Sequence, residues 1–188
     1  MNIGVIIMAI NIRRPEVDDI DQLTKHFNET ILDIFSREDI QDDDLCSGEM
    51  KEKMVFLMED LDSKGKDRYF LVATVDGEIA GTIAYGPSNE LIHECTHGEL
   101  NDIGEIGTVY VHPKFQKQGI GMKLMNAMYI SLISRGVSEY CLDSGYSSAQ
   151  EIWTRKLGAP EYVSKDHWGT GNDHMVWHKK LDDIHITI

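Results

Sequence analysis

The most informative stretch of the sequence is Val109-Tyr110-Val111-His112-Pro113-Lys114-Phe115-Gln116-Lys117-Gln118-Gly119-Ile120-Gly121. It begins with apolar residues typical of a β-strand, continues with a proline that ends the strand, and finishes with two glycines where a helix is predicted to start. The amino terminus of a helix has free backbone N–H groups and the positive end of the helix dipole, which together favour a phosphate. Gly119 and Gly121 let a ligand approach the backbone closely, because they carry no Cβ. The stretch therefore predicts a phosphate-binding loop between a strand and a helix.

The charges around this loop support that interpretation. Lys114, Lys117 and Lys123 are positive in a chain whose formal net charge is −14. Spacing excludes two established nucleotide motifs: the P-loop pattern G-x-x-x-x-G-K-(S/T) does not occur, and the dinucleotide fingerprint needs a third glycine where the chain has Leu124. The remaining alternative is an ordinary helix start that contains two loop glycines.

Hydrophobic periodicity on both sides of this stretch predicts a series of strands and helices. Helical spacing covers residues 17–35, 49–61, 119–135 and about 148–157, and strand patterns cover residues 10–13, 69–75, 79–85, 106–111, 140–143, about 162 and 174–181. Asp76-Gly77, between two strand patterns, is typical of a two-residue hairpin turn. The polar segment from Pro87 to Asp102 is expected to form a long loop or a short helix. This order predicts an α/β fold with a mixed sheet and helices on both faces.

Length and composition narrow the class of protein. The chain has 188 residues, of which 41% are hydrophobic and 27% charged, as in an ordinary globular domain. No apolar run approaches the ~20 residues of a membrane span, and the net charge of −14 disfavours nucleic acid as a partner. An acidic chain suits a cationic partner such as an amine, although acidity also improves solubility. Cys46, Cys95 and Cys141 show no paired spacing, which indicates a reducing, cytoplasmic location.

The amino-terminal segment is mostly apolar from Ile3 to Ile12, but no Lys or Arg precedes it and Arg13-Arg14 follow it. A signal peptide has the opposite order of charged and apolar residues. We therefore expect a first strand here, and Met8 is a second candidate for the start of the chain.

A known family shares the central motif. Gln116-x-x-Gly119-x-Gly121, directly after Tyr-Val-His-Pro, resembles the acetyl-CoA signature (Arg/Gln)-x-x-Gly-x-(Gly/Ala) of the GNAT family of N-acetyltransferases. The downstream run Ala149…Trp153…Lys156-Leu157-Gly158 and the order of elements extend the resemblance from about Ile10 to Leu181. The resemblance implies one acetyltransferase domain over residues 1–188, with a core of about 10–181. It also implies a GNAT-like fold, in which a mixed, mostly antiparallel sheet is flanked by helices on both faces.

The resemblance implies acetyl-CoA as the co-substrate, with no metal. Backbone N–H groups from Gln118 to Met122 would hold the pyrophosphate of coenzyme A. The strand from Val109 to Val111 would pair with the pantetheine arm and polarise the thioester carbonyl, and hydrogen bonds to the oxyanion there would supply much of the catalysis. The residues expected to contact the cofactor are Val109, Tyr110, Val111, Gln116, Lys117, Gln118, Gly119, Ile120, Gly121, Met122 and Ser147.

The reaction also needs a base, because an amine with a pKa of about 10.4 is neutral in only roughly one molecule in 2,500 at pH 7. The resemblance implies a glutamate near the start of the strand, and Glu105 is the matching residue. Counting by two places Glu105 on the same side of the strand as Gly107, Val109 and Val111. The alternative is an exposed carboxylate at a strand edge. No cysteine lies where a covalent acetyl-enzyme would form, so we expect direct attack by the amine in a ternary complex.

The general acid departs from the family pattern. The family often has a tyrosine four residues after the helix alanine, but counting from the two ends of this segment gives Trp153 or Thr154. Tyr146 is the candidate catalytic acid, with Ser147 and Tyr110 as alternatives. A coenzyme A thiol has a pKa near ~8.5 and can leave largely unassisted. Trp153 is expected to pack in the core.

Two other functions remain open. A non-catalytic acyl-CoA-binding or sensing domain would keep the loop from Gln116 to Gly121 without turnover. A zinc hydrolase would use His93-Glu94-Cys95-Thr96-His97, a literal H-E-x-x-H sequence, for two metal ligands and a base. No third ligand follows at the usual spacing, and Gly98 shortens any helix there. A loop near the acceptor site, with histidines that contact substrate, is therefore favoured.

Acidic residues bear on the acceptor. The run Asp42-Asp43-Asp44 is expected to be a solvated loop between the first two helices, where the family commonly builds part of its acceptor site. An acidic acceptor site suits a cationic primary amine of a polyamine, an aminoglycoside-like molecule or a lysine-bearing peptide. The resemblance is also consistent with a homodimer. His167, His174 and His178, near the carboxyl end, are expected to be structural.

Overall fold

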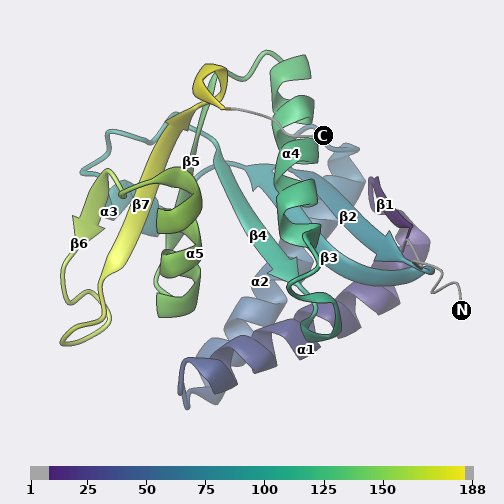
Figure 1. Ribbon diagram of the computed structural model, residues 1–188, viewed down its shortest axis with the longest axis horizontal. Coiled ribbons are helices and arrows are strands. Elements are labelled where there is room, and N and C mark those ends of the chain that lie inside the picture. The colour runs from purple at the N-terminus through teal and green to yellow at the C-terminus, as the bar shows by residue number, and fades with distance from the viewer. Residues whose placement is uncertain (1–8, 185–188) are drawn as a thin grey trace, which may run out of the picture.

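The computed structural model describes residues 9–184 and shows a seven-stranded sheet with helices on both faces (Figure 1). The strands are β1 (Ile10–Arg13), β2 (Tyr69–Val75), β3 (Glu78–Gly86), β4 (Glu105–Val111), β5 (Glu139–Ser144), β6 (Tyr162–Ser164) and β7 (His174–Lys180). The helices are α1 (Ile20–Arg37), α2 (Asp43–Ser63), α3 (Glu90–Cys95), α4 (Ile120–Ser134) and α5 (Ser147–Leu157), with short 3-10 helices at Val17–Asp19, Pro113–Phe115 and Leu181–Asp183. The strand order is β1-β2-β3-β4-β5-β7-β6, and every neighbouring pair is antiparallel except β4 with β5. The predicted mixed, mostly antiparallel sheet is confirmed.

Apolar layers hold the helices against the sheet. α4 and α5 cover one face, where Leu124, Met128 and Trp153 are buried, as expected for Trp153. α1 and α2 cover the other face, mainly through a buried stripe of α1 at helical spacing that comprises Leu23, Phe27, Ile31 and Phe35. Figure 1 shows α4 and α5 in front of the sheet, with α2 behind it. The sheet therefore separates two layers of side chains, one beneath α4 and α5 and the other beneath α1 and α2.

The first two helices begin at residues that the periodicity did not predict. The Asp19 carboxylate accepts two hydrogen bonds from Arg13, at 2.6 and 2.8 Å, and α1 begins directly after it rather than at residue 17. α2 begins at Asp43 rather than at residue 49, because the Asp42 side chain accepts a hydrogen bond from the Leu45 N–H at 2.8 Å and caps the helix. The run 42–44 is therefore a helix start and not a loop, and its negative charge suits the helix dipole.

Two local predictions are confirmed. β2 and β3 form the predicted hairpin, and Asp76 and Gly77 both have positive φ angles, 51° and 83°, as a type I′ turn requires. The segment between β3 and β4 contains the short helix α3. It is capped by Asn89, whose side chain accepts a hydrogen bond from the Ile92 N–H at 2.9 Å.

A β-bulge in β4 determines which side chains face each layer. Thr82 lies opposite Tyr110, and Ala84 lies opposite Gly107, so β4 has one residue more than β3 between these pairs. Thr108 accommodates the extra residue with a φ of +52°, an uncommon angle for a β-branched side chain. The Thr82 hydroxyl donates a hydrogen bond to the Thr108 carbonyl at 3.0 Å and supports this backbone.

The bulge corrects the predicted orientation of Glu105. Its neighbour Ile106 packs in the α4 layer together with Val109 and Val111, so Glu105 faces the opposite layer. Gly107 shares that side, since a Cβ built on it would meet the Glu105 Oε1 at 2.6 Å. The expectation that Glu105 also shares a side with Val109 and Val111 is wrong, because the extra residue at Thr108 reverses the alternation.

No helix within residues 9–184 is both long and apolar enough to cross a membrane. The first strand begins at Ile10, as expected. The predictions for residues 3–9 as a strand and for Met8 as a start fall largely on residues 1–8, which lie outside the described residues.

Candidate active site

The loop before α4 depends on backbone geometry. Gly119 is the N-cap of α4 with a φ of +80°, a left-handed conformation that glycine adopts without strain. The space outside Gly119 is open, since an added Cβ would meet no atom within 4 Å. At Gly121 an added Cβ would lie 3.6 Å from Val111, which is an ordinary contact. The first N–H groups of a helix have no partner within it, and the space beside Gly119 is open, a combination that suits an anion site.

Side chains connect this loop to the end of β4. Gln116 Nε2 donates a hydrogen bond to the Val111 carbonyl at 3.1 Å, and Gln118 Nε2 donates one to the Lys114 carbonyl at 3.3 Å. Ile120 is 1% exposed beneath the loop, so only its backbone can face a ligand. These contacts position the backbone, and they leave its N–H groups available for a ligand.

The lysines near the loop differ in their pairing. Lys114 forms an ion pair with Glu78 at 2.5 Å. Lys117 and Lys123 are exposed, and neither takes part in an ion pair within residues 9–184. Met122, in the first turn of α4, is 41% exposed. Two uncompensated positive charges therefore remain beside the helix start, in an otherwise acidic chain.

β4 and β5 separate beside this loop. Their parallel pairing is limited to Glu105 opposite Cys141, with a hydrogen bond from the Cys141 N–H to the Gly104 carbonyl at 2.9 Å. The two strands then diverge toward their carboxyl ends (Figure 1). Within the described residues, β5 offers no pairing partner to Val109, Tyr110 or Val111. The edge of β4 that was predicted to bind the pantetheine arm is thus not paired with β5, and the Val111 carbonyl there accepts the hydrogen bond from Gln116.

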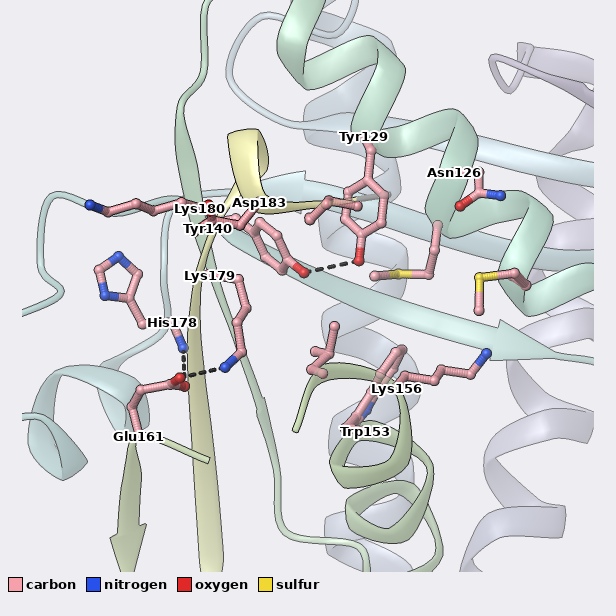
Figure 2. Close-up of a pocket in the computed structure, with 14 residues that line it drawn as sticks. Asn126, Tyr129, Tyr140, Trp153, Lys156, Glu161, His178, Lys179, Lys180 and Asp183 are labelled. Carbon is pink, nitrogen blue, oxygen red and sulfur yellow. Dashed lines mark hydrogen bonds and ion pairs between the residues drawn. The ribbon is translucent and has the colours of Figure 1, made fainter. Parts of the chain in front are cut away.

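A cavity of about 690 Å³ lies between α4 and α5, on the same side of the sheet as the loop (Figure 2). Its lining includes Met122, Tyr129 and Tyr140, and the hydroxyls of the two tyrosines are hydrogen-bonded to each other at 2.9 Å. Lys156 of α5 also lines the cavity, and burial lowers the pKa of its ammonium group. Because the cavity adjoins the first turn of α4, a long ligand bound at the loop has room to extend between the helices.

Glu105 lies on the opposite face of β4, next to the start of α3. Its Oε2 accepts hydrogen bonds from the backbone N–H and the side-chain Nδ2 of Asn89, both at 3.1 Å. Burial, and next the negative charge of Asp143, raise the pKa of Glu105 to about 8, against the opposing charges of Lys53 and Arg68. A carboxyl group with this pKa can accept a proton from a substrate near neutral pH. Glu105 is therefore not an exposed carboxylate at a strand edge.

Glu49 of α2 is a candidate site residue that the sequence did not indicate. Its carboxylate accepts hydrogen bonds from the hydroxyls of Tyr110, on β4, and Tyr146, just after β5. None of the ion pairs among residues 9–184 involves Glu49. The three residues bridge the two strands where they separate, on the face opposite the α4 loop. They place an uncompensated negative charge there.

Comparison with known families decides the class of protein. The model of the acetyltransferase (GNAT) family matches residues 28–159, which is most of the chain. The chain belongs to this family. The resemblance seen in the sequence is thereby confirmed. No curated protein matches the chain.

Solved GNAT structures have the same fold. PaiA N-acetyltransferase of Thermoplasma acidophilum, in complex with coenzyme A, is 17% identical, with 92% of this chain and 99% of that one covered and a TM-score of 0.66. YncA of Salmonella typhimurium, with its cofactor acetyl-CoA, is 17% identical, with 96% and 98% covered and a TM-score of 0.65. The ribosomal-protein-alanine N-acetyltransferase of Brucella melitensis is 19% identical, with 90% and 99% covered and a TM-score of 0.63. At these identities the likeness establishes the shared fold.

Two predicted site residues of this GNAT chain lie at the start of α5. Burial, and next the charge of Glu49, raise the pKa of the Tyr146 hydroxyl well above its ordinary value, which disfavours transfer of its proton to a thiolate. Ser147 donates its N–H and its hydroxyl to Glu38, at 3.1 and 2.6 Å, so cofactor binding through Ser147 would require Glu38 to move. The roles assigned to Tyr146 and Ser147 stay predictions.

The H-E-x-x-H sequence does not place two histidines on one helix. α3 ends at Cys95, and His97 lies beyond it with a φ of +52°. The other histidine, His93, is hydrogen-bonded through Nε2 to the Ser88 hydroxyl at 2.9 Å. In the described part of the chain, no three His, Cys, Asp or Glu side chains are grouped in a way that could hold a metal ion.

Asn89 and Asp143 were not predicted as site residues, although each has a weak signal in the local sequence. Asn89 directly precedes a short helix, which is typical of an N-cap. Asp143 follows Tyr140, Cys141 and Leu142, all buried, so it introduces a charge at the end of an apolar strand. Glu49 carried no such signal, because nothing in its local pattern distinguishes it from the other polar residues of α2.

Proposed function

We propose that this protein transfers the acetyl group of acetyl-CoA to a primary amine by direct attack in a ternary complex. The observation that carries the proposal is the position of Glu105. This carboxyl group, with its raised pKa, lies on one face of β4, and the open glycine loop lies at the far end of the same strand. Membership of the GNAT family and the coenzyme A complexes of its structural neighbours support acetyl-CoA as the donor.

The residues of the chain have separate tasks in this reaction. The loop from Gln116 to Met122 binds the pyrophosphate through backbone N–H groups, and the edge of β4 that is not paired with β5 binds the pantetheine arm. Glu105 accepts a proton from the ammonium group, directly or through water, and the neutral amine attacks the thioester carbonyl. Backbone N–H groups of β4 donate to the oxyanion that forms. The C–S bond then breaks as the amide forms, one proton passes through Glu105 to solvent, and the second reaches the departing thiolate.

We also propose that the acceptor carries a second positive charge, which binds at Glu49. A half-buried carboxylate without a cationic partner favours a cationic ligand. The charge of Glu52 acts on Tyr110, and that of Glu38 acts on Tyr146, so further carboxylates surround the same position. The acidic run 42–44 lies at the exposed start of the same helix and adds a longer-range attraction.

The remaining expectations belong to the same proposal. We propose that the chain acts as one catalytic domain in the cytoplasm, where Cys46, Cys95 and Cys141, which are free thiols here, stay reduced. The homodimer stays a prediction, and light scattering of the purified chain checks it.

The test is an assay of thiol release from acetyl-CoA at pH 8 with a panel of amines. The panel contains a polyamine, an aminoglycoside, a lysine-bearing peptide and a monoamine with no second charge. We expect thiol release that depends on the amine, with higher kcat/KM for acceptors that carry two or more positive charges. Tight binding of acetyl-CoA with no release for any amine would contradict the transferase and support an acyl-CoA-sensing domain.

A further inference from the structure

Two carboxylates share one amide group next to the proposed base. The Asn89 Oδ1 accepts the hydrogen bond from the Ile92 N–H, so the orientation of the Asn89 side chain is determined by the cap of α3. The opposite side of the amide, Nδ2, then donates to the Glu105 Oε2 at 3.1 Å and to the Asp143 Oδ2 at 3.2 Å. Asn89 thus connects Glu105 on β4 to Asp143 on β5.

A buried histidine holds Asp143 in place. His174 of β7 is 2% exposed, and its Nε2 lies 3.0 Å from the Asp143 Oδ2. Its Nδ1 accepts a hydrogen bond from the Trp168 Nε1–H at 3.2 Å. An indole N–H can only donate, so the His174 Nδ1 is an acceptor without a proton, and the ring proton is on Nε2 and points at Asp143. Trp168 reaches this place over Gly145, where a Cβ would meet the Trp168 Nε1 at 2.5 Å.

The charges around Glu105 do not cancel that of Asp143. The groups that act on Glu105 are Lys53 of α2, Arg68 before β2, and Asp143 together with the neighbouring Cys141 of β5. Lys53 is paired with Glu52, and Arg68 is paired with Glu59 at 2.9 Å, so each positive charge already has a negative partner. The partners of Asp143 are an amide and an imidazole whose Nδ1 accepts a hydrogen bond and so carries no proton, and neither brings a positive charge to Asp143.

We propose that Asp143, anchored by His174, is a positioning residue for Glu105: it fixes the carboxylate through Asn89 and keeps it in a negative field that strengthens it as a base. The inference rests on the proposed role of Glu105 in acetyl transfer. It adds a second carboxylate and a histidine from β5 and β7, strands that contribute neither the base nor the cofactor loop.

The same two strands provide a matched control. Glu139 of β5 and His178 of β7 form a second carboxylate–histidine pair, at 2.8 Å between Oε2 and Nε2. Their side chains are 34% and 28% exposed, against 15% and 3% for Asp143 and His174. Among residues 9–184, the Glu139 side chain is hydrogen-bonded to His178 and not to Asn89. Replacing Glu139 removes an equal charge from the same strand and leaves the bridged carboxylates intact.

The experiment is a carboxyl-carbon NMR titration of the protein labelled with δ-¹³C glutamate, in which the signal of Glu105 is assigned by its loss in Glu105→Gln. We expect wild-type Glu105 to titrate near pH 8. Asp143→Asn keeps the shape and both hydrogen-bond acceptor contacts but removes the charge, so the midpoint should fall by about one pH unit or more. Glu139→Gln should leave the midpoint unchanged. An unchanged midpoint in Asp143→Asn, or an equal fall in Glu139→Gln, would overturn the proposal.

A second variant keeps the proposal testable if Asp143→Asn does not fold. Asn89→Ser retains a capping oxygen for α3 but lacks the bridging Nδ2, so Glu105 loses a donor to its charged form and its midpoint should rise. A fall or no change in Asn89→Ser would contradict the bridge. The titration needs neither acetyl-CoA nor an acceptor. Failure of the thiol-release assay would therefore reject the proposed function but not the effect of Asp143 on the titration of Glu105. A titration that contradicts the role of Asp143 would, in turn, leave the proposed acetyl transfer untouched.

Discussion

The two faces of β4 differ in the charged and polar groups that they present. On the α4 face, one continuous segment, residues 109–123, supplies backbone N–H groups, a glycine in a left-handed conformation and the exposed lysines 117 and 123. On the α2 face, Glu49, Asn89, Glu105 and Asp143 come from different elements. The three carboxylates among them are buried or half-buried, and Asn89 donates to two of them. The first face suits a phosphate that stays partly solvated, and the second suits a group that must lose a proton.

This difference follows from the chemistry of each task. Binding a phosphate needs several donors at a helix start, and these are available in any sequence that makes the turn. Burial or a second negative charge raises the pKa of a carboxyl group, and at Glu105 both come from the packing of distant segments. Variants that affect one face and spare the other test whether the two tasks are separate.

The largest effect is expected from Glu105→Gln, which keeps the hydrogen bonds from Asn89 as far as an amide oxygen allows but cannot accept a proton. General base catalysis contributes roughly 10²- to 10⁴-fold, so kcat/KM should fall by about that factor at pH 8. Stopped-flow or steady-state thiol release measures it. The affinity for acetyl-CoA should stay within about twofold, and a rate close to wild type would reject Glu105 as the base.

The same variant should change the pH dependence of stability. The pKa of Glu105 is about 8 in the folded protein and near 4.5 when unfolded, so the contribution of this group to stability is complete below about pH 4.5 and is lost as the pH rises to about 8. An amide side chain at this position cannot ionise, so Glu105→Gln should gain on the order of 4 kcal/mol relative to wild type between pH 4.5 and 9. Urea unfolding across this range measures the gain. Glu139→Gln is the control, and parallel curves for wild type and Glu105→Gln would contradict the raised pKa.

A smaller effect is expected for Glu49→Gln, on the acceptor alone. Loss of the charge should raise KM for a dicationic acceptor about five- to tenfold, on the order of 1 kcal/mol, with little change for acetyl-CoA. Asp43→Asn removes the same charge from the exposed start of the same helix and should leave KM within about twofold. Equal effects of the two variants would mean that only the general acidity of α2 matters.

The smallest effect concerns the bulge that separates the two faces. Thr82→Val is nearly isosteric and removes the hydrogen bond to the Thr108 carbonyl, so the free energy of unfolding should fall by about 1–2 kcal/mol. Thr74→Val, on β2, is the control, because no side-chain hydrogen bond of Thr74 is present within residues 9–184. Chemical denaturation of both variants compares them. Equal stability losses would show that the bulge does not depend on Thr82.

The parts of the fold that depend on local rules could be read from the sequence. Apolar spacing located α1 and α4 to within a few residues, and Asp76-Gly77 located the hairpin. The α4 loop could be predicted for the same reason, since its glycines, lysines and proline are adjacent in the chain.

The remaining parts depend on contacts that no local pattern encodes. The bulge places Thr108 at a positive φ, which is unusual for threonine, so nothing in the sequence marks the extra residue. Strict alternation along the strand therefore places Glu105, wrongly, on the same side as Val109 and Val111. Glu49 and Asp143 are 56 and 38 residues from Glu105 and reach the site only through packing of α2 and β5. The start of α2 was missed because its cap at Asp42 precedes the apolar residues.

Calorimetric titration with acetyl-CoA tests the central claim most directly. The α4 loop is disrupted by Gly121→Asp: aspartate in the first turn of a helix suits the helix dipole and should not impair folding, but its charge repels a phosphate. We predict one acetyl-CoA bound per chain, an affinity at least tenfold weaker in Gly121→Asp, and an unchanged affinity in Glu105→Gln. Absence of binding to the wild-type chain, or equal affinity in Gly121→Asp, would contradict the account.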